Sequence, residues 1–223
     1  MSNVLIIAAH PDDELLGCGG TIALHAMQGD KVTVVIVCEG ESLRYSHEGV
    51  GQQENIYSAA AILGVTDVRL LGFPDQQLDK YTLTEIISPL EQIVSEIKPE
   101  IVYCQYGGDI NRDHKILFEA ASVALRPIVE YLEVFYSFYT VSSTEWAYPR
   151  TFIPDTWVDI TSTIDKKLEA FSCYKSEIRE YPHPRSIETL KYSANFYGSQ
   201  CCINSAEVFM TIRRVCRNGK TPL

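Results

Sequence analysis

The sequence is short of positive charge, of long hydrophobic runs and of secretory features, and each shortage excludes a class of protein. Its 223 residues include 29 Asp and Glu against 19 Lys and Arg, a net charge of −10. That balance disfavours nucleic acid as a partner, because phosphate binding needs a basic surface. No apolar run approaches the roughly 20 residues of a membrane-spanning helix. No basic segment with a cleavage site begins the chain, so we expect no signal peptide.

Paired cysteines and a dinucleotide-binding loop are also lacking. The seven cysteines are scattered apart from the neighbours Cys201 and Cys202, and no Cys-x-x-Cys pair offers a zinc site. An odd number of cysteines without a secretory signal is typical of reduced thiols, so we expect a cytoplasmic protein. No Gly-x-Gly-x-x-Gly motif follows the first apolar run, since the glycines at residues 17–20 come too late and lack the spacing. A nucleotide-binding Rossmann protein is therefore disfavoured.

Apolar runs and amphipathic stretches alternate along the first 140 residues. Strands are predicted at residues 4–8, 31–38, 68–71, 101–105 and 134–139, and helices at 13–28, 52–63, 82–98 and 114–130. This alternation predicts an α/β, Rossmann-like fold with a mostly parallel sheet and helices on both faces. Gly17, Gly19 and Gly20 each cost about 1 kcal/mol inside a helix relative to alanine. We therefore expect the first helix to pack closely on the sheet.

A cluster of ionisable residues follows the first predicted strand. The chain there reads Ala8-Ala9-His10-Pro11-Asp12-Asp13-Glu14, and ligands of open α/β sheets bind beyond the carboxyl ends of the strands. His10 and Asp13 supply one nitrogen and one oxygen ligand for a divalent metal, and Pro11 restricts the backbone between them. The alternative is a polar loop with a helix cap, which the preceding strand and the following glycines make less favourable.

The cluster and the residues that follow it resemble the signature of the PIG-L/LmbE-type zinc N-deacetylases. The following residues are Leu15-Leu16-Gly17-Cys18-Gly19-Gly20-Thr21-Ile22. The similarity continues through residues 53–64, 70–75 and 107–114, and so covers at least the first 125 residues. Members of this family remove acetyl groups from N-acetylglucosamine-like sugars on varied carriers. The resemblance implies an LmbE-like deacetylase fold, a zinc ion and a small amino-sugar substrate. It leaves a homo-oligomer open, because relatives are often oligomers.

A second polar cluster follows the fourth predicted strand. In a parallel sheet its loop opens on the same edge as the first cluster, so His114 is the natural third metal ligand beside His10 and Asp13. A His, Asp, His set with an open position for water is typical of a catalytic zinc site, although it would also accept Fe²⁺ or Mn²⁺. Asp109 or Asp113 is expected to orient the other nitrogen of a histidine ligand.

The second cluster departs from the family pattern at one position. The family usually has His-Pro-Asp-His where this chain has Asn111-Arg112-Asp113-His114. Asp113 matches the acid beside the ligand, while Asn111 replaces a histidine that helps to stabilise the oxyanion in the family. Asn111 can still donate a hydrogen bond to an oxyanion, but it cannot protonate a leaving amine. The general acid is then either Asp12 or a residue elsewhere.

Four further residues are candidates for work at the site. His183 and Arg185 lie in a segment that prolines make rigid. We expect His183 to act as an acid or to support the site, and Arg185 to contact an anion. Arg44 follows the second predicted strand, and an arginine in the matching family loop contacts substrate. Tyr106 is expected to stack on a sugar or to donate to the oxyanion. Each also has an ordinary explanation as a loop, strand-end or subunit-packing residue.

These features predict a zinc-dependent hydrolase that removes the acetyl group of an N-acetylated amino sugar or sugar conjugate. Asp12 is expected to be the general base, while zinc activates water and polarises the carbonyl. Residues 157–183 resemble deacetylases of bacterial surface-polysaccharide and sugar-nucleotide pathways, which makes a sugar nucleotide one candidate substrate. The aglycone stays open between a nucleotide, a lipid, a thiol precursor and a free sugar.

The alternative prediction is a sugar-binding or scaffold protein with a degenerate metal site. The length of the chain suits one domain over residues 1–223. Within it, the part from about residue 140 is expected to complete the rim of the active site.

Overall fold

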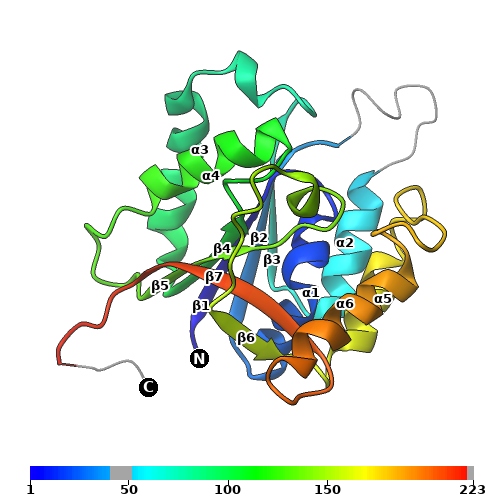
Figure 1. Cartoon of the computed structure of the whole chain (residues 1–223). Coiled ribbons are helices and arrows are strands. Elements are labelled where there is room, and N and C mark those ends of the chain that lie inside the picture. The colour runs from blue at the N-terminus through cyan, green and yellow to red at the C-terminus, as the bar shows by residue number, and fades with distance from the viewer. Residues whose placement is uncertain (41–51, 220–223) are drawn as a thin grey trace.

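The computed structural model of the protein describes residues 1–40 and 52–219. A seven-stranded sheet with the order β3-β2-β1-β4-β5-β7-β6 lies at its centre (Figure 1). Its strands are β1 (Asn3–Ala8), β2 (Lys31–Cys38), β3 (Asp67–Phe73), β4 (Ile101–Gln105), β5 (Val134–Phe138), β6 (Thr156–Asp159) and β7 (Ala206–Arg214). The first five run parallel, and β7 is antiparallel to both β5 and β6. The predicted α/β fold with a mostly parallel sheet is confirmed.

Helices cover both faces of the sheet, as Figure 1 shows. One face carries α1 (Asp13–Met27), α2 (Gln52–Leu63), α5 (Ile164–Phe171) and α6 (Ile187–Ser199), and the other carries α3 (Leu83–Ile97) and α4 (Arg112–Ala124). Alternate residues of β1 enter the two cores: Val4 and Ile6 pack with the first group of helices, and Leu5 and Ile7 with the second. Burial on both faces explains why this strand is apolar throughout.

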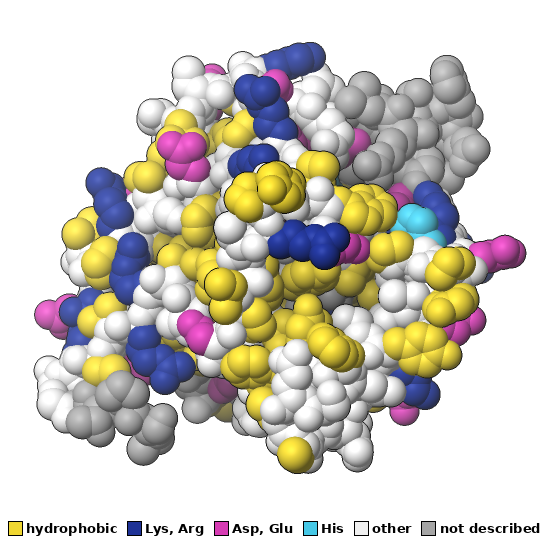
Figure 2. All heavy atoms as spheres, viewed as in Figure 1, with side chains coloured by type: hydrophobic (Ala, Val, Ile, Leu, Met, Phe, Trp, Pro, Cys, Tyr) yellow, Lys and Arg dark blue, Asp and Glu magenta, His cyan; other side chains and the backbone are white. Residues whose placement is uncertain are grey.

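The surface shows no gathered basic region on the face drawn in Figure 2. Lys and Arg side chains are scattered across that face. In the described part of the chain, no helix is long and apolar enough to cross a membrane.

The structure corrects the predicted elements in two places. The helix expected at 114–130 is α4, which ends at Ala124, because a residue preceding a proline, here Arg126 before Pro127, is disfavoured in the helical conformation. The sequence pattern also missed β6, α5, α6 and β7, which complete the sheet and one of its faces beyond residue 155.

Helix α1 packs too closely on its neighbours for side chains at two of its glycines. A Cβ atom at Gly17 would overlap the ring of Phe138 at the end of β5, and one at Gly20 would lie 2.8 Å from Cδ1 of Ile160. The helix is also irregular at Cys18, where φ is −144° and ψ is 24°. The expected close packing is thus present, and it accounts for glycine here despite its low helix propensity.

Two buried charged side chains complete the irregular turn of α1. The carboxylate of Glu207 on β7 accepts hydrogen bonds from the backbone nitrogens of Gly20 and Thr21, at 2.9 and 2.7 Å. Nζ of Lys167 on α5 donates to the carbonyl of Leu16 at 3.0 Å and to Glu207 Oε1 at 2.6 Å. Because a buried charge without a partner is strongly destabilising, each member of this pair depends on the other. The distal elements therefore hold α1 in its irregular shape.

We expect the substitution Gly17→Ala to lower the free energy of unfolding by about 1–3 kcal/mol, the cost of overpacking a close-packed interior. Gly19→Ala is the matched control in the same helix, because a Cβ there would lie 3.2 Å from Cγ of Lys167, a flexible chain that yields more readily than a ring. Chemical denaturation of the unaltered protein and both variants measures the difference. Equal stability of the two variants would contradict the packing argument.

Candidate metal centre and active-site cleft

The two polar clusters meet at the carboxyl ends of neighbouring strands. His10 lies between β1 and α1, Asp13 is the first residue of α1, and His114 lies in the first turn of α4 after β4. Since β1 and β4 are adjacent and parallel, both loops open on the same edge of the sheet. Asp13 and His114 are buried, whereas the side chain of His10 stays 12% exposed.

Three donor atoms from these residues surround one point. Asp13 Oδ2 lies 3.2 Å from His10 Nδ1 and 3.1 Å from His114 Nε2, and the two nitrogens are 3.3 Å apart. Ligands at about 2.0–2.1 Å from a tetrahedral ion are separated by roughly 3.3–3.4 Å. The three side chains therefore fit a divalent cation with a fourth position open.

Each histidine of this set has its second nitrogen against a carboxylate. Nε2 of His10 lies 3.1 Å from Asp113 Oδ2 and 3.3 Å from Asp75 Oδ1, and Nδ1 of His114 lies 3.2 Å from Asp109 Oδ2. A carboxylate in this position fixes the tautomer and the ring orientation of a ligating histidine. The sequence predicted that Asp109 or Asp113 would orient a histidine ligand in this way. In the structure both do so, Asp113 at His10 and Asp109 at His114. Asp113 orients His10 and does not face the open position directly.

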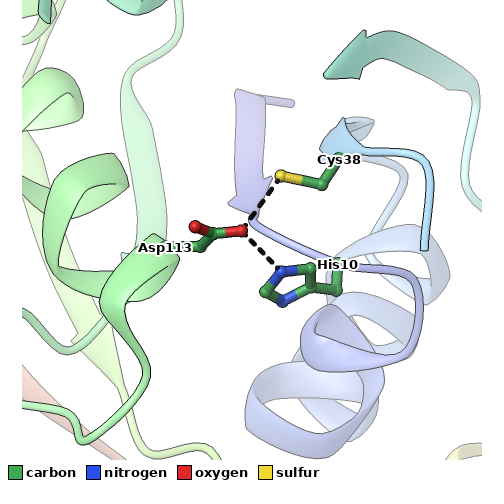
Figure 3. A group of neighbouring side chains, drawn as sticks. All are labelled: His10, Cys38 and Asp113. Atoms are coloured by element: carbon green, nitrogen blue, oxygen red, sulfur yellow. Dashed lines mark hydrogen bonds and ion pairs between the residues drawn. The ribbon is translucent and has the colours of Figure 1, made fainter. Parts of the chain in front are cut away.

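Asp113 also links His10 to Cys38, as Figure 3 shows. The thiol of Cys38 donates to Asp113 Oδ2 at 3.6 Å, and the backbone nitrogen of Leu78 donates to Oδ1 at 3.1 Å. His10, Cys38 and Asp113 form a second group whose atoms could hold a metal. Both oxygens of Asp113 are occupied by these hydrogen bonds, and Asp113 Oδ2 also faces His10. We therefore assign this group to the support of His10.

The charges at the centre favour a bound cation. Burial alone would lower the pKa of both histidines, but hydrogen bonds to Asp113 and Asp13 raise that of His10 to about 9, and the charge of Asp13 raises that of His114 to about 10. Burial would raise the pKa of Asp13, yet His114 and His10 hold it well below its usual range. A positive charge at this site therefore stabilises the buried, ionised carboxylates.

Asp12 lies beside the metal centre in an unusual backbone conformation. Its φ is +91°, in the left-handed region, where Asp and Asn occur more often than other residues with a Cβ. The side chain is buried, and Oδ2 accepts a hydrogen bond from Arg185 Nη1 at 2.9 Å. Burial raises the pKa of Asp12 and the Arg185 charge opposes it, leaving a value of about 7. Such a carboxyl group can take and return a proton near neutral pH.

Arg185 lines the cleft and holds the proposed base. Its guanidinium donates to Asp12, to Glu177 Oε2 at 2.6 Å and, through Nε, to Ser142 Oγ at 2.8 Å. Arg185 thus holds Asp12 in place, a role that the sequence did not predict, and its expected contact with an anion of the substrate stays a prediction.

Asn111 is the N-cap of α4 and lines the same cleft. Its Oδ1 accepts a hydrogen bond from the backbone nitrogen of Asp113 at 2.8 Å, and its own backbone nitrogen donates to Asp109 Oδ1 at 2.9 Å. These two bonds fix the amide group. The cap uses only the side-chain oxygen, which leaves the NH₂ group as the donor for a ligand.

The distal segment folds back over the carboxyl edge of the sheet and brings His183 to the cleft. Nδ1 of His183 accepts a hydrogen bond from the backbone nitrogen of Arg185 at 3.0 Å. A neutral histidine that accepts at Nδ1 carries its proton at Nε2. His183 therefore has a donor available on its other side.

One predicted contact with substrate, Tyr106, lies outside the cleft. Tyr106 is buried, its hydroxyl forms a 2.6 Å hydrogen bond with Thr151 Oγ1, and its ring packs on Phe152. Tyr106 is not among the cleft-lining residues in the described part of the chain, so its expected stacking or donor role is corrected to a packing role. Arg44 lies outside the described residues.

Sequence reasoning missed several residues of the cleft, which encloses ≈ 210 Å³. They include Asp75, Gln76, Ser142, Ser143, Trp146, Glu177 and Arg179. Asp75 is the last residue of the segment 70–75, which resembles the family, and this resemblance could have indicated that Asp75 belongs to the site. Nothing local marks Trp146 or Glu177, because they reach the cleft only through the folding of the distal half.

Comparison with known proteins identifies the family of this chain. The family described as PIG-L, GlcNAc-PI de-N-acetylase, matches residues 5–125, which is more than half of the chain. The chain belongs to the PIG-L family. This confirms the resemblance drawn from the sequence. The matched stretch contains every proposed metal ligand of this PIG-L protein.

Relatives of this PIG-L protein include more than one kind of enzyme. A probable N-acetyl-alpha-D-glucosaminyl L-malate deacetylase 2 of Bacillus anthracis is 29% identical over 185 residues, covering 78% of this chain and 81% of that protein. Crystallised GalB of Pseudomonas putida, a 4-carboxy-2-hydroxymuconate hydratase, is 26% identical with a TM-score of 0.78, covering 98% and 99%. N,N'-diacetylchitobiose deacetylase of Pyrococcus horikoshii shares the fold, with a TM-score of 0.73 at 22% identity, covering 94% and 83%.

Proposed function

We propose that this protein is a metal-dependent N-deacetylase that hydrolyses the acetamide group of an amino sugar or amino-sugar conjugate. One observation carries the proposal: His10, Asp13 and His114 surround a single point in a cleft, and the carboxylate of Asp12 lies beside them. Membership of the PIG-L family and the likeness to a deacetylase of an N-acetylglucosaminyl conjugate support the substrate class. The products are then acetate and the free amine.

We propose zinc as the ion, with His10, Asp13 and His114 as its protein ligands. Two imidazoles and one carboxylate suit Zn²⁺, and they also suit Fe²⁺ or Mn²⁺. When bound, such an ion lowers the pKa of a water molecule towards neutrality and polarises the carbonyl of the substrate.

Residues of the chain supply the proton transfers. Asp12 acts as the general base, held by Arg185 at one oxygen and able to titrate near neutral pH. The leaving amine must be protonated before it departs. Asp12 returns the proton to the amine. The alternative donor, His183, would have to be an imidazolium protonated at both nitrogens, whereas its Nδ1 accepts a hydrogen bond from the Arg185 backbone nitrogen. The neighbouring acid Glu14 is unsuited as a base, because it is buried and is not among the described residues that line the cleft.

We expect Asn111→Ala to lower kcat about 10²-fold with little change in KM, since a donor to the oxyanion is needed only in the transition state. Asn111→Ser is the matched control, because serine keeps an N-cap for α4 but removes the amide donor. Steady-state kinetics should show both variants impaired in kcat. Normal kcat in Asn111→Ser would restrict the residue to its capping role.

Release of acetate tests the proposed reaction. The metal-loaded protein is incubated with N-acetylglucosamine, its nucleotide conjugate and a lipid or thiol-precursor conjugate, and acetate is measured. We expect release from at least one of them. Stoichiometric metal and bound sugar without any acetate would favour the alternative, a sugar-binding or scaffold protein.

A second candidate reaction is the addition of water to an unsaturated carboxylate. The likeness to the hydratase GalB, at 26% identity over nearly the whole of both chains, favours it. A metal ion beside a carboxylate base would serve that chemistry as well. The same assay separates the two, since a hydratase consumes the ultraviolet absorbance of a conjugated diacid and releases no acetate.

We further propose that residues 1–223 form one cytoplasmic domain. Strands β6 and β7 extend the sheet built by the first half of the chain. The distal residues Glu177 and His183 line the same cleft as the metal centre, which supports the idea that the distal part completes the active-site rim.

A further inference from the structure

A large aromatic side chain lies at the cleft and has no part in the chemistry above. Trp146 is the last residue of the short 3-10 helix Thr144–Trp146, and its side chain lines the cleft while remaining 53% exposed. The ring of His183 meets it edge to face, with 6.2 Å between the ring centroids and 90° between the planes. One exposed aromatic residue is common on protein surfaces, so its significance depends on how firmly it is held.

The loop that carries Trp146 is closed by its own hydrogen bonds. The backbone nitrogen of Thr144 donates to the carbonyl of Thr140 at 2.9 Å, and the nitrogen of Thr140 donates to Thr144 Oγ1 at 2.9 Å. The nitrogen of Ser142 donates to the Glu145 carboxylate at 2.6 Å. Trp146 itself donates from its backbone nitrogen to Ser143 at 3.3 Å. These bonds fix the backbone of the loop at Trp146, and the indole itself rests against His183.

The same loop is tied to the metal centre. Asp109 accepts hydrogen bonds from the hydroxyls of Ser143 and Thr144, and its Oδ2 also faces His114 Nδ1 at 3.2 Å. The carboxylate that orients a metal ligand is thus the one that anchors the Trp146 loop.

A second tie joins the loop to the proposed base. Ser142 Oγ accepts from Nε of Arg185 at 2.8 Å, and Arg185 holds Asp12 at 2.9 Å. The loop that carries the indole is consequently tied to the residues that hold His114 and Asp12. A ligand that stacked on Trp146 would therefore lie in a defined position relative to His114 and Asp12.

We propose that Trp146 is the platform on which the sugar ring bearing the acetamide stacks, and that it selects cyclic amino sugars over other acetamides. This inference rests on the proposed deacetylase function. An indole face suits the apolar C–H face of a pyranose, and the polar side chains that line the rest of the cleft suit its hydroxyl groups. The cleft of ≈ 210 Å³ is smaller than the roughly 300–1,000 Å³ of pockets for drug-sized ligands. It therefore suits one sugar ring, with any carrier outside.

Steady-state kinetics on two substrates test the platform. With N-acetylglucosamine or its best-cleaved conjugate, Trp146→Ala should raise KM about tenfold and leave kcat nearly unchanged, because stacking stabilises ground and transition states alike. Trp146→Phe should restore most of the loss. With N-acetylethanolamine, which has the acetamide but no ring, Trp146→Ala should change nothing. Tyr148→Ala is the matched control, since Tyr148 is 96% exposed nearby and does not line the cleft.

Fluorescence provides a readout that does not depend on turnover. The chain has two tryptophans, so Trp146 is the only one left in Trp157→Phe, and N-acetylglucosamine should change its emission. Binding without acetate release would leave the platform standing and overturn the deacetylase function. Acetate release with an unchanged KM for the ring substrate in Trp146→Ala would overturn the platform and leave the function standing. An equal loss on the acyclic acetamide would also overturn it.

Discussion

Replacing Asp13 or His114 by alanine is expected to remove the bound metal and acetate release together. Each substitution takes away one of three donor atoms that lie 3.1–3.3 Å apart. It also leaves the remaining two short of the three protein ligands that a catalytic zinc site uses. Since the ion supplies several kcal/mol of transition-state stabilisation, turnover should fall at least about 10³-fold. Metal analysis and acetate assays on the same preparations measure the two losses.

The control for this experiment is Glu119→Ala, which removes an exposed acid from the same helix that carries His114. That variant should keep both metal and turnover. Circular dichroism establishes that the ligand variants remain folded. Full metal occupancy in a folded Asp13→Ala or His114→Ala protein would show that the ligand set is wrong.

Asp12→Asn is expected to keep the metal and to lower turnover by roughly 10²–10⁴-fold, the usual contribution of general acid–base catalysis. The amide cannot accept the proton, while it preserves the shape of the side chain and one oxygen for Arg185. Left-handed backbone at this position is tolerated by Asn as by Asp, so the loop should stay intact. Metal content and kcat, measured on one sample, separate this result from the loss of a ligand.

Glu14→Gln is the matched comparison for Asp12→Asn. Glu14 is buried and is not among the described residues that line the cleft, so an amide of the same shape should replace it with little loss of turnover. Near-normal turnover in Asp12→Asn together with a severe loss in Glu14→Gln would move the base to Glu14.

The sequence was sufficient for the proximal half of the fold and for the meeting of the three candidate metal ligands. The strands at 31–38 and 101–105 and the helix at 52–63 were predicted with the bounds that the structure gives. Their patterns are local: continuous apolar runs for strands buried on both faces, and a glycine after the helix. His10, Asp13 and His114 could be placed together because parallel strands end at one edge of the sheet.

The distal half could not be predicted in the same way. Strand β7 gains its stability from pairing with β5 and β6, a long-range property that leaves little periodicity in its own residues. The partner of Arg185 was unpredictable for a related reason, because Asp12 lies 173 residues away in sequence. Tyr106 was misassigned because its place at the end of β4 is clear from sequence, whereas its hydrogen bond to Thr151 depends on a distant loop.

The central claim is that this cleft, loaded with a metal, hydrolyses the acetamide of an amino sugar. Acetate release from an N-acetylglucosamine conjugate should be measured before chelation, after chelation and after addition of one equivalent of Zn²⁺. We expect release to disappear with the metal and to return with zinc, and Asp12→Asn to stay inactive when it is reloaded. Undiminished acetate release from the metal-free protein would contradict the account, as would its absence from a protein fully occupied by Zn²⁺, Fe²⁺ or Mn²⁺.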